Sequence, residues 1–106
     1  MLQPGYKKGK VIVFTNDCYD LLHLGHIKSF QYSKRFGDKL AVAVNSDASI
    51  KRLKGEGRPI DSLDERTSTL AYLNMIDLMI SFEEDIVINT INTIEPDIYY
   101  RRRVQT

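Results

Sequence analysis

Two histidines, His23 and His26, carry the clearest chemical signal in this 106-residue sequence, which contains no other histidine. They are three residues apart, with Gly25 between them, where an amphipathic segment begins. Residues at positions i and i+3 share one face of a helix, so both imidazoles can face a single bound group. Gly25 removes a side chain that would crowd that group. Imidazoles can donate hydrogen bonds to phosphate oxygens as negative charge develops in a transition state.

The residues around the histidines predict a strand, a polar loop and then a helix. Residues 11–14 are β-branched or aromatic and too few for a helix, so they predict a buried strand. Apolar residues then recur at helical spacing from Ile27 until Gly37, which is expected to end the helix. A helix that follows a parallel strand offers unpaired N–H groups and the positive end of its dipole to an anion. The pattern therefore predicts a phosphate site and favours in-line attack on an α-phosphate, without a covalent protein intermediate.

Three blocks of the sequence resemble a known enzyme family. CYDLLHLGH at residues 18–26 resembles the HxGH signature, with its lead-in, of the nucleotidyltransferase superfamily. AVNSDAS at residues 43–49 and RLKGEGRPI at residues 52–60 narrow the resemblance to the adenylyltransferase domain of bacterial ADP-heptose synthesis, D-glycero-β-D-manno-heptose 1-phosphate adenylyltransferase, a relative of glycerol-3-phosphate cytidylyltransferase. The similarity runs from about Lys10 to Asp97. HxGH alone is a weak signal, but in a strand-to-helix context with the other blocks in order it is a strong one.

The resemblance implies transfer of a nucleotidyl group from ATP to a sugar phosphate, with heptose 1-phosphate favoured, release of pyrophosphate, and Mg²⁺ bound with the triphosphate. The implied catalytic residues are His23, His26 and Lys54. The implied nucleotide-binding residues are Thr15, Asn16, Asp17, Cys18, Tyr19, His23, Gly25 and His26. The residues implied to bind the substrate or its phosphates are Asp20, Asn45, Ser46, Asp47, Lys54, Arg58 and Arg66. The acceptor's phosphate oxygen is already a nucleophile, so no general base is expected.

The sequence departs from the family at two places and ends early. Asp17 stands where the family usually has glycine, and its charge could repel a nucleotide or help to hold Mg²⁺. Residues 101–106 (RRRVQT) replace a Lys-Gly-Gly-Asp-Tyr block, and the later strand and helix start of relatives do not follow. A solvated tail is the simpler interpretation of the arginines. Two other functions therefore stay open: a CTP-dependent cytidylyltransferase acting on glycerol 3-phosphate or a similar alcohol phosphate, and a nucleotide-binding remnant without turnover.

Several of the named residues also have a purely structural interpretation. The histidines could be surface or capping residues at the helix start, which the motif context disfavours. Asp20 could be a turn or N-cap residue, or could orient an imidazole or a metal. For Arg66, a buried ion pair and a ligand contact are equally compatible with the sequence.

The remaining elements complete an α/β pattern. Strands are expected at residues 39–44, 78–82 and 97–100. Residues 50–64 are expected to form a loop over the active edge, in which Lys51 and Arg52 are solvated. A capping box of Ser62 and Glu65 begins the next helix, and residues 83–85 give an acidic first turn to a helix that runs to Ile94. These elements predict a single Rossmann-like domain over residues 1–106, with a parallel sheet of about four strands flanked by helices, a flexible lead at 1–9 and a tail at 101–106.

Composition excludes several classes of protein. A net charge of +1, with both signs spread along the chain, gives no electrostatic case for nucleic acid. The single cysteine excludes an internal disulfide and a thiolate zinc cluster. No apolar run approaches the roughly 20 residues of a membrane span, and no signal-peptide pattern begins the chain, so a cytoplasmic enzyme or binding protein without a membrane partner is expected. A homodimer is a further hypothesis, because a short sheet leaves exposed edges.

Overall fold

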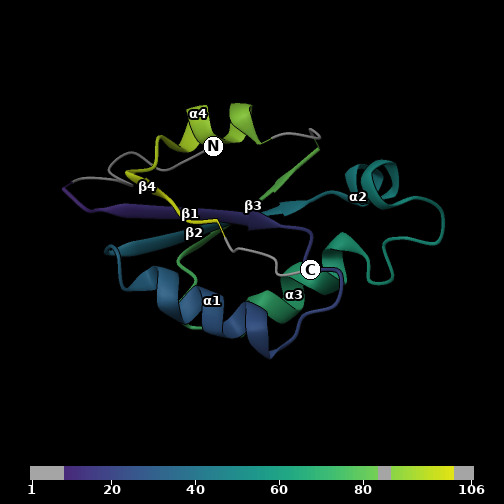
Figure 1. Cartoon of the computed structure of the whole chain (residues 1–106), viewed down its shortest axis with the longest axis horizontal. Helices are drawn as coiled ribbons and strands as arrows, with labels where there is room; N and C mark the ends of the chain where they lie inside the picture. The colour runs from purple at the N-terminus through teal and green to yellow at the C-terminus, as the bar shows by residue number, and fades with distance from the viewer. Residues whose placement is uncertain (1–8, 84–86, 102–106) are drawn as a thin grey trace.

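A four-stranded parallel sheet organises the structure, a computed structural model that describes residues 9–83 and 87–101. The strand order is β3-β2-β1-β4, with β1 at Ile12–Asp17, β2 at Lys39–Asn45, β3 at Leu78–Phe82 and β4 at Ile98–Tyr99. Figure 1 shows α1 (Leu24–Lys34) and α3 (Leu63–Leu70) on one face and α4 (Ile88–Ile94) on the other. The predicted α/β Rossmann-like sheet is therefore confirmed. Of the predicted lead and tail, residues 1–8 and 102–106 lie outside the described residues.

Alternate residues of the two central strands supply two separate cores. Toward α1 and α3, strand residues pack with residues of the helices and of the loop after β1, and the buried set is Val13, Tyr19, Phe30, Leu40, Val42, Val44 and Leu70. Toward α4, the buried set is Ile12, Phe14, Ala41, Ala43, Phe82 and Ile94. Since helices cover both faces, the central strands are apolar at nearly every position, as buried parallel strands are. This packing holds the carboxyl ends of β1 and β2 side by side.

Strand β1 is longer than the sequence indicated. Asn16 and Asp17 were expected in a polar loop, but Asn16 pairs in register with Ala43 and Asp17 with Val44. Parallel pairing satisfies main-chain groups whatever the side chain, so the polarity of these residues was a poor guide. The extension carries both side chains to the edge where the strands end.

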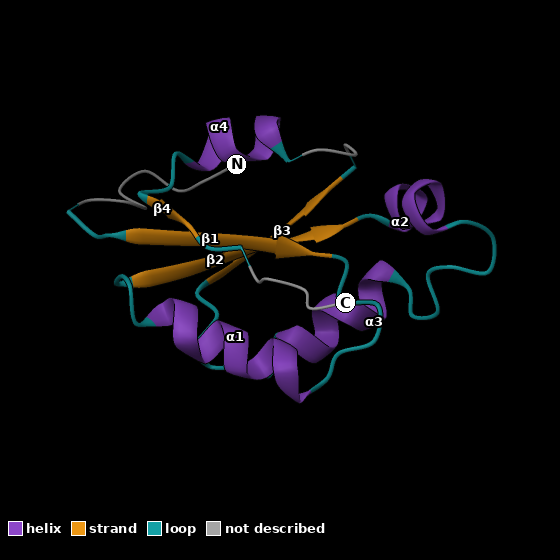
Figure 2. Ribbon diagram, in the orientation of Figure 1, coloured by secondary structure: helices purple, strands orange, loops and turns teal. Residues whose placement is uncertain are grey.

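Helix α2 (Asp47–Lys54) corrects the prediction of a loop from residue 50 to residue 64. Its Ser46 Oγ accepts a hydrogen bond from the Ser49 backbone N–H at 3.1 Å, which caps the first turn. Basic residues fill its last turn, where they complement the helix dipole, and Ile50 is fully buried. Figure 2 shows α2 beyond the carboxyl ends of the strands, so this helix and the shorter loop after it border the predicted site.

The two later helices differ in how well the sequence predicted them. The capping box of Ser62 and Glu65 is confirmed at the start of α3. The prediction of an acidic first turn for α4 is wrong, because α4 begins at Ile88, after Val87, and has no acidic residue in its first turn. Of the predicted acidic residues, Glu84 and Asp85 lie outside the described residues. In the described part of the chain, no helix has the length and apolar composition that crossing a membrane requires.

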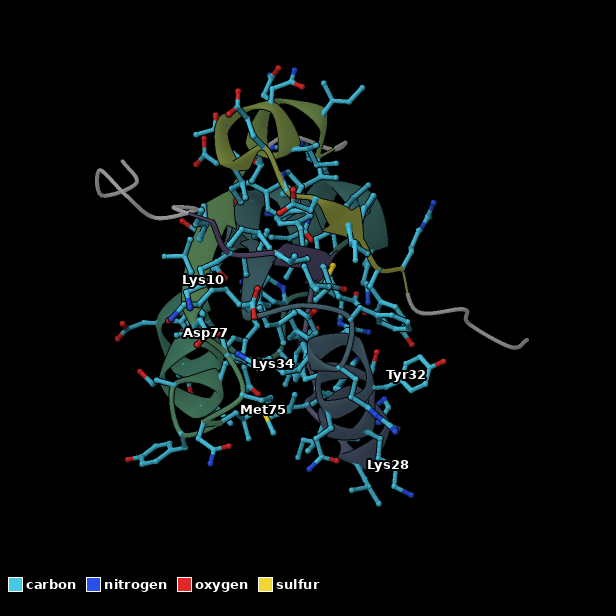
Figure 3. All side chains as sticks on the ribbon, turned by 90° about the vertical axis from the view of Figure 1, so that its left-hand side faces the viewer. Lys10, Lys28, Tyr32, Lys34, Met75 and Asp77 are labelled. Carbon is cyan, nitrogen blue, oxygen red and sulfur yellow. The ribbon has the colours of Figure 1, made fainter. Side chains whose placement is uncertain are left out.

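Asp77 joins the helix layer to the sheet. Its Oδ2 atom forms a salt bridge with Lys34 of α1 and accepts a hydrogen bond from the Leu40 N–H of β2 at 2.7 Å. Figure 3 shows Lys34 and Asp77 turned toward each other at this end of the molecule. The pair fixes the end of α1 opposite the predicted phosphate site.

Gly37 follows α1 for a different reason from the one expected. The glycines with positive φ among the described residues are Gly9, Gly55 and Gly57, so Gly37 is not a left-handed helix cap. A Cβ atom at Gly37 would lie 2.8 Å from the Val11 carbonyl oxygen. The glycine is needed because the chain passes this close to β1.

Candidate functional site

The candidate site lies at the carboxyl edge of the sheet. Strand β1 ends there at Asp17 and β2 at Asn45, while α1 begins at Leu24 and α2 at Asp47. In an open parallel sheet, ligands bind at this edge. Every residue that the sequence implied as a ligand of the nucleotide or of the acceptor lies on these elements, on the loops between them, on the loop after α2 or on α3.

His23 and His26 cap the start of α1 reciprocally. His23 Nδ1 accepts a hydrogen bond from the Gly25 N–H at 3.0 Å, and His26 Nδ1 accepts one from the His23 N–H at 3.3 Å. The two rings lie with their centroids 4.1 Å apart and their planes tilted by 31°. The capping role that the motif context disfavoured is therefore present, and it places both rings side by side.

The caps also determine which nitrogen of each ring can donate. In a neutral imidazole one nitrogen accepts and the other carries the hydrogen. Because both Nδ1 atoms accept from the backbone, the hydrogen of each neutral ring is on Nε2. The same contacts that begin the helix thus prepare two N–H donors for an anion.

Asp17 lies beside this pair of donors. Its Oδ1 atom accepts a hydrogen bond from the Cys18 N–H at 2.7 Å, and its Oδ2 atom is 3.8 Å from His26 Nε2. A backbone N–H and an imidazole are the groups expected to meet a phosphate here. The Asp17 carboxylate therefore holds part of the position that an anionic ligand would take.

Cys18 and Tyr19 contribute backbone geometry more than side-chain chemistry. Tyr19 has φ of 53°, a left-handed conformation that is uncommon for a residue with a side chain and that turns the chain sharply after Cys18. Burial raises the pKa of the Cys18 thiol, and the nearby charge of Lys54 only partly offsets this. Burial also raises the pKa of the Tyr19 hydroxyl. Both side chains therefore stay neutral at physiological pH.

Asp20 anchors the loop that follows α2. Its carboxylate accepts hydrogen bonds from Arg58 Nε at 2.5 Å, from the Ile60 N–H at 2.7 Å and from the Asp61 N–H at 3.1 Å. Burial by itself would raise the pKa of Asp20, but these bonds outweigh it and the pKa lies below its usual range. Asp20 is not the N-cap that one interpretation predicted, because His23 caps α1. Its carboxylate orients the loop of residues 58–61.

Arg66 joins four parts of the site through a side chain that is fully buried. Its Nη1 donates to the carbonyl oxygens of Cys18 at 2.8 Å and Asn45 at 2.7 Å. Its Nη2 donates to Asp47 Oδ1 at 2.7 Å, and its Nε donates to the Asp61 carbonyl oxygen at 3.1 Å. Of the two roles compatible with the sequence, the structure shows the buried ion pair.

The polar residues that end β2 also have internal partners. Asn45 Nδ2 donates to Ser49 Oγ at 2.9 Å, and Ser46 caps α2. Asp47 pairs with Arg66 but keeps a side chain that is 50% exposed. These contacts position the start of α2 and leave Asp47 accessible to a ligand.

Of the four basic residues Lys51, Arg52, Lys54 and Arg58, the two arginines have protein partners that the sequence did not predict. Arg58 donates its Nε–H to Asp20, whereas Lys54 is exposed at the end of α2. Lys51 pairs weakly with Glu56 at 3.7 Å on the surface, as expected for a solvated residue. Arg52 was also expected to be solvated, but it donates to the Glu83 carbonyl oxygen and so ties α2 to the end of β3.

The sequence reasoning missed one residue at this edge. Tyr99, at the end of β4, donates a hydrogen bond from its hydroxyl to Asn16 Oδ1. A tyrosine at the end of the fourth predicted strand was the available signal, since the carboxyl ends of parallel strands share one edge. Among the described residues, no group of three or more His, Cys, Asp and Glu side chains could hold a metal ion.

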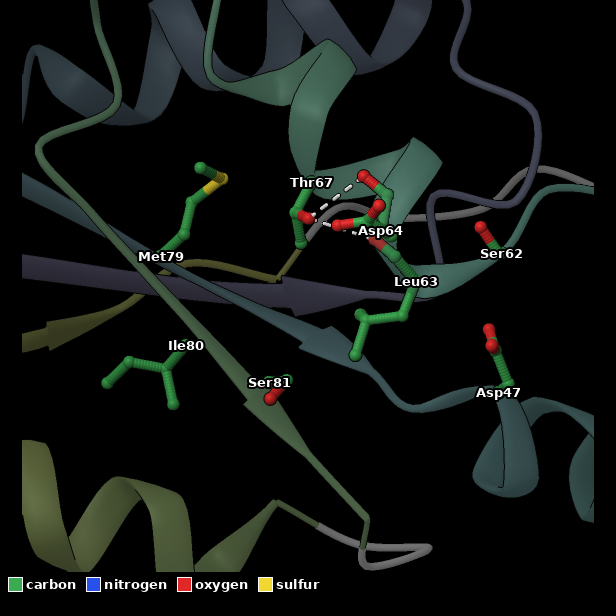
Figure 4. Close-up of a pocket in the computed structure, with 8 residues that line it drawn as sticks. All are labelled: Asp47, Ser62, Leu63, Asp64, Thr67, Met79, Ile80 and Ser81. Carbon is green, nitrogen blue, oxygen red and sulfur yellow. Dashed lines mark hydrogen bonds between the residues drawn. The ribbon is translucent and has the colours of Figure 1, made fainter.

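Two hollows border the site. An open hollow of about 610 Å³ lies between α3 and β3, and Figure 4 shows its lining of Asp47, Ser62, Leu63, Asp64, Thr67, Met79, Ile80 and Ser81. It touches the site through Asp47 and does not include the histidines. A partly enclosed cavity of about 10 Å³, the size of a single water molecule, lies at His26 and is also lined by Asn16 and Asp17.

Comparison with known proteins identifies related sequences. The cytidylyltransferase-like family matches residues 14–105. Bifunctional protein HldE of Syntrophotalea carbinolica is 49% identical over 98 residues, which are 92% of this chain and 20% of that protein. Bifunctional protein HldE of Nitratiruptor sp. is 53% identical over 93 residues, which are 88% of this chain and 20% of that protein. The chain thus spans about one fifth of the length of these curated relatives.

A solved structure shares the fold. The lipopolysaccharide core biosynthesis protein from Thermoplasma volcanium superposes with a TM-score of 0.78 and 31% sequence identity. The match covers 86% of this chain and 73% of that one.

Replacing Arg66 by lysine should lower the free energy of unfolding by about 2 kcal/mol or more. A lysine cannot reach four acceptors with one planar group, so buried carbonyl oxygens of Cys18 and Asn45 lose their donors. Urea unfolding followed by circular dichroism measures the change. Arg35→Lys, at an exposed position, is the matched control. An Arg66→Lys value within about 0.5 kcal/mol of the wild type would contradict the structural role.

Asp20 should make stability depend on pH below about pH 4. Because its folded pKa is lowered, its contribution is complete above the unfolded pKa and is lost as pH falls through the folded one. The wild type should therefore exceed Asp20→Asn in free energy of unfolding at neutral pH, and the difference should shrink on acidification. Urea titrations at several pH values measure this, with Asp64→Asn on the exposed side of α3 as the control for a lost charge. A difference that is independent of pH would exclude the proposed contribution.

Proposed function

The chain belongs to the cytidylyltransferase-like family, and we propose that it transfers a nucleotidyl group from ATP to a sugar phosphate with release of pyrophosphate. The observation that carries the proposal is the pair of imidazoles at the start of α1, each of which accepts its capping hydrogen bond through Nδ1 rather than Nε2. Heptose 1-phosphate is the proposed acceptor. The similarity to HldE proteins over most of this chain, and to a protein of lipopolysaccharide core biosynthesis, supports it.

The proposed nucleotidyl transfer requires stabilisation of negative charge on the phosphate, and it does not require a covalent protein intermediate. His23 and His26 would donate to the α-phosphate as its charge grows during attack by the acceptor's phosphate oxygen. The backbone at Cys18 and Tyr19 would approach the triphosphate, and the exposed Lys54 would neutralise charge beside it. Arg58 would act mainly through Asp20, by holding the loop, and could reach the ligand with its remaining N–H groups.

Mg²⁺ is the proposed cofactor, and it would shield the charge of the triphosphate. The described residues hold no three-residue metal cluster, so the ion would be bound chiefly by phosphate oxygens and water, which Mg²⁺ tolerates well. CTP in place of ATP is the second candidate, and the family description favours it. The block at residues 52–60, which resembles adenylyltransferases, favours ATP.

Loss of either imidazole should slow turnover by about 100-fold or more. His23→Asn and His26→Gln are the sharpest variants, because asparagine at the N-cap and glutamine at the third helical position can keep the capping box. Thermal unfolding should then change little, while the rate of pyrophosphate release from ATP with heptose 1-phosphate falls. Tyr72→Phe, with a side chain exposed far from the edge, is the control.

The same assay discriminates the alternatives. Turnover with CTP and glycerol 3-phosphate, but not with ATP, would indicate a cytidylyltransferase. Saturable nucleotide binding by the wild type without pyrophosphate release would indicate a remnant that binds but does not react. Wild-type rates in both histidine variants would refute the proposed role of the imidazoles.

Removing the charge of Asp17 should tighten nucleotide binding by about five-fold. The carboxylate competes with a phosphate for the Cys18 N–H and for His26, and it repels the triphosphate. Asp17→Asn removes the charge while keeping the size, and Asp17→Gly also frees the Cys18 N–H. Calorimetric titration with ATP measures the affinity of both. Weaker binding of Mg²⁺ and ATP by Asp17→Asn would instead assign Asp17 to the metal.

A further inference from the structure

Strands β1 and β4 flank the point in the sheet where the order of successive strands reverses. The chain proceeds from β1 outward to β2 and β3, and then returns to place β4 on the other side of β1. In open parallel sheets, the crevice at such a switch point is where ligands bind. Asn16 lies near the end of β1, and Tyr99 is the last residue of β4.

The register explains how these two side chains meet. Tyr99 is the partner of Phe14 across the β1–β4 pair, and the two rings lie 5.6 Å apart. Asn16 is two residues farther along β1, on the same face as Phe14 and about 7 Å closer to the carboxyl edge. The tyrosine leans along the strand, and its hydroxyl donates to Asn16 Oδ1.

In this contact Asn16 Oδ1 faces the Tyr99 hydroxyl, and Nδ2 is turned away from it. Asparagine offers an acceptor oxygen and a donor NH₂ group of nearly equal shape. With Oδ1 bonded to Tyr99, the Nδ2 group is left without an acceptor among residues 9–83 and 87–101. A phosphate oxygen accepts hydrogen bonds only, so this orientation is the one that a nucleotide requires.

The site already described lies next to Asn16. Asn16 and Asp17 both line the small cavity at His26, so the end of β1 that carries Asn16 is adjacent to the start of α1. We propose that Tyr99 is a positioning residue, which holds the Asn16 amide so that Nδ2 donates to a phosphate oxygen of the bound nucleotide. The inference rests on the proposed function, because it requires a nucleotide at this edge.

A double-mutant cycle tests whether Tyr99 acts through Asn16. Tyr99→Phe removes the hydroxyl and keeps the ring on Phe14, and it should weaken ATP binding about five-fold by calorimetry. Asn16→Ala should weaken binding at least as much. In the Asn16→Ala background, Tyr99→Phe should have no further effect on the dissociation constant, because the hydroxyl has no amide left to hold.

Two further variants sharpen the test. Asn16→Asp keeps an oxygen for Tyr99 but replaces the donor with a negative charge, so it should weaken ATP binding more than Asn16→Ala does. Tyr72→Phe removes a hydroxyl from an exposed residue and should leave the dissociation constant unchanged. Thermal unfolding of each variant separates a loss of positioning from a loss of stability.

Each outcome decides the inference. If the wild type binds ATP and Tyr99→Phe binds it equally well, or if Tyr99→Phe weakens binding by the same factor with and without Asn16, the positioning role is overturned while the proposed function stands. If the wild type binds neither ATP nor CTP, the proposed function fails, and the positioning role fails with it. Full non-additivity of the two substitutions supports the role.

Discussion

The candidate site depends on the buried guanidinium of Arg66. One planar group from α3 holds the chain at the ends of β1 and β2, the start of α2 and the loop that Asp20 also binds. Taking a charge out of water is costly unless its donors are satisfied, and here three carbonyl oxygens and one carboxylate accept hydrogen bonds from the guanidinium. The fork of arginine suits this geometry, because its donors diverge in one plane. Without it, the elements that carry the proposed nucleotide-binding residues would have no common anchor.

A second constraint is that local stabilising contacts also prepare the chemistry. Helix α1 has no serine or aspartate at its N-cap; an imidazole occupies that position, and another reaches back from the third residue of the helix. Each ring satisfies a backbone N–H through Nδ1, and this leaves Nε2–H as its donor. The helix start therefore gains its caps and its anion donors from the same two side chains. Glycine between them keeps the approach open.

Charges at the edge are distributed unevenly. Asp20 forms an ion pair with Arg58, and Asp47 forms one with Arg66, so both carboxylates chiefly stabilise the protein's own structure. Asp17 differs, because its oxygens face the Cys18 N–H and the His26 ring. Lys54 lies exposed at the end of α2, and its charge acts on the Cys18 thiol. The balance between Asp17 and the donors around it is thus the main electrostatic feature of this edge.

The sequence alone was sufficient where the determining contacts are local. The apolar runs predicted the strands, the Ser62–Glu65 pair predicted the start of α3, and the spacing of His23 and His26 predicted two imidazoles on one helical turn. It failed at α2, whose Ser46 cap and basic last turn were outweighed by the nearby glycines. Only the tertiary structure decided the extension of β1 through Asp17, the partners of Arg66 and Asp20, and the contact of Tyr99 with Asn16. These contacts join residues that are far apart along the chain, and their geometry follows from strand register and packing, which periodicity and propensity do not specify.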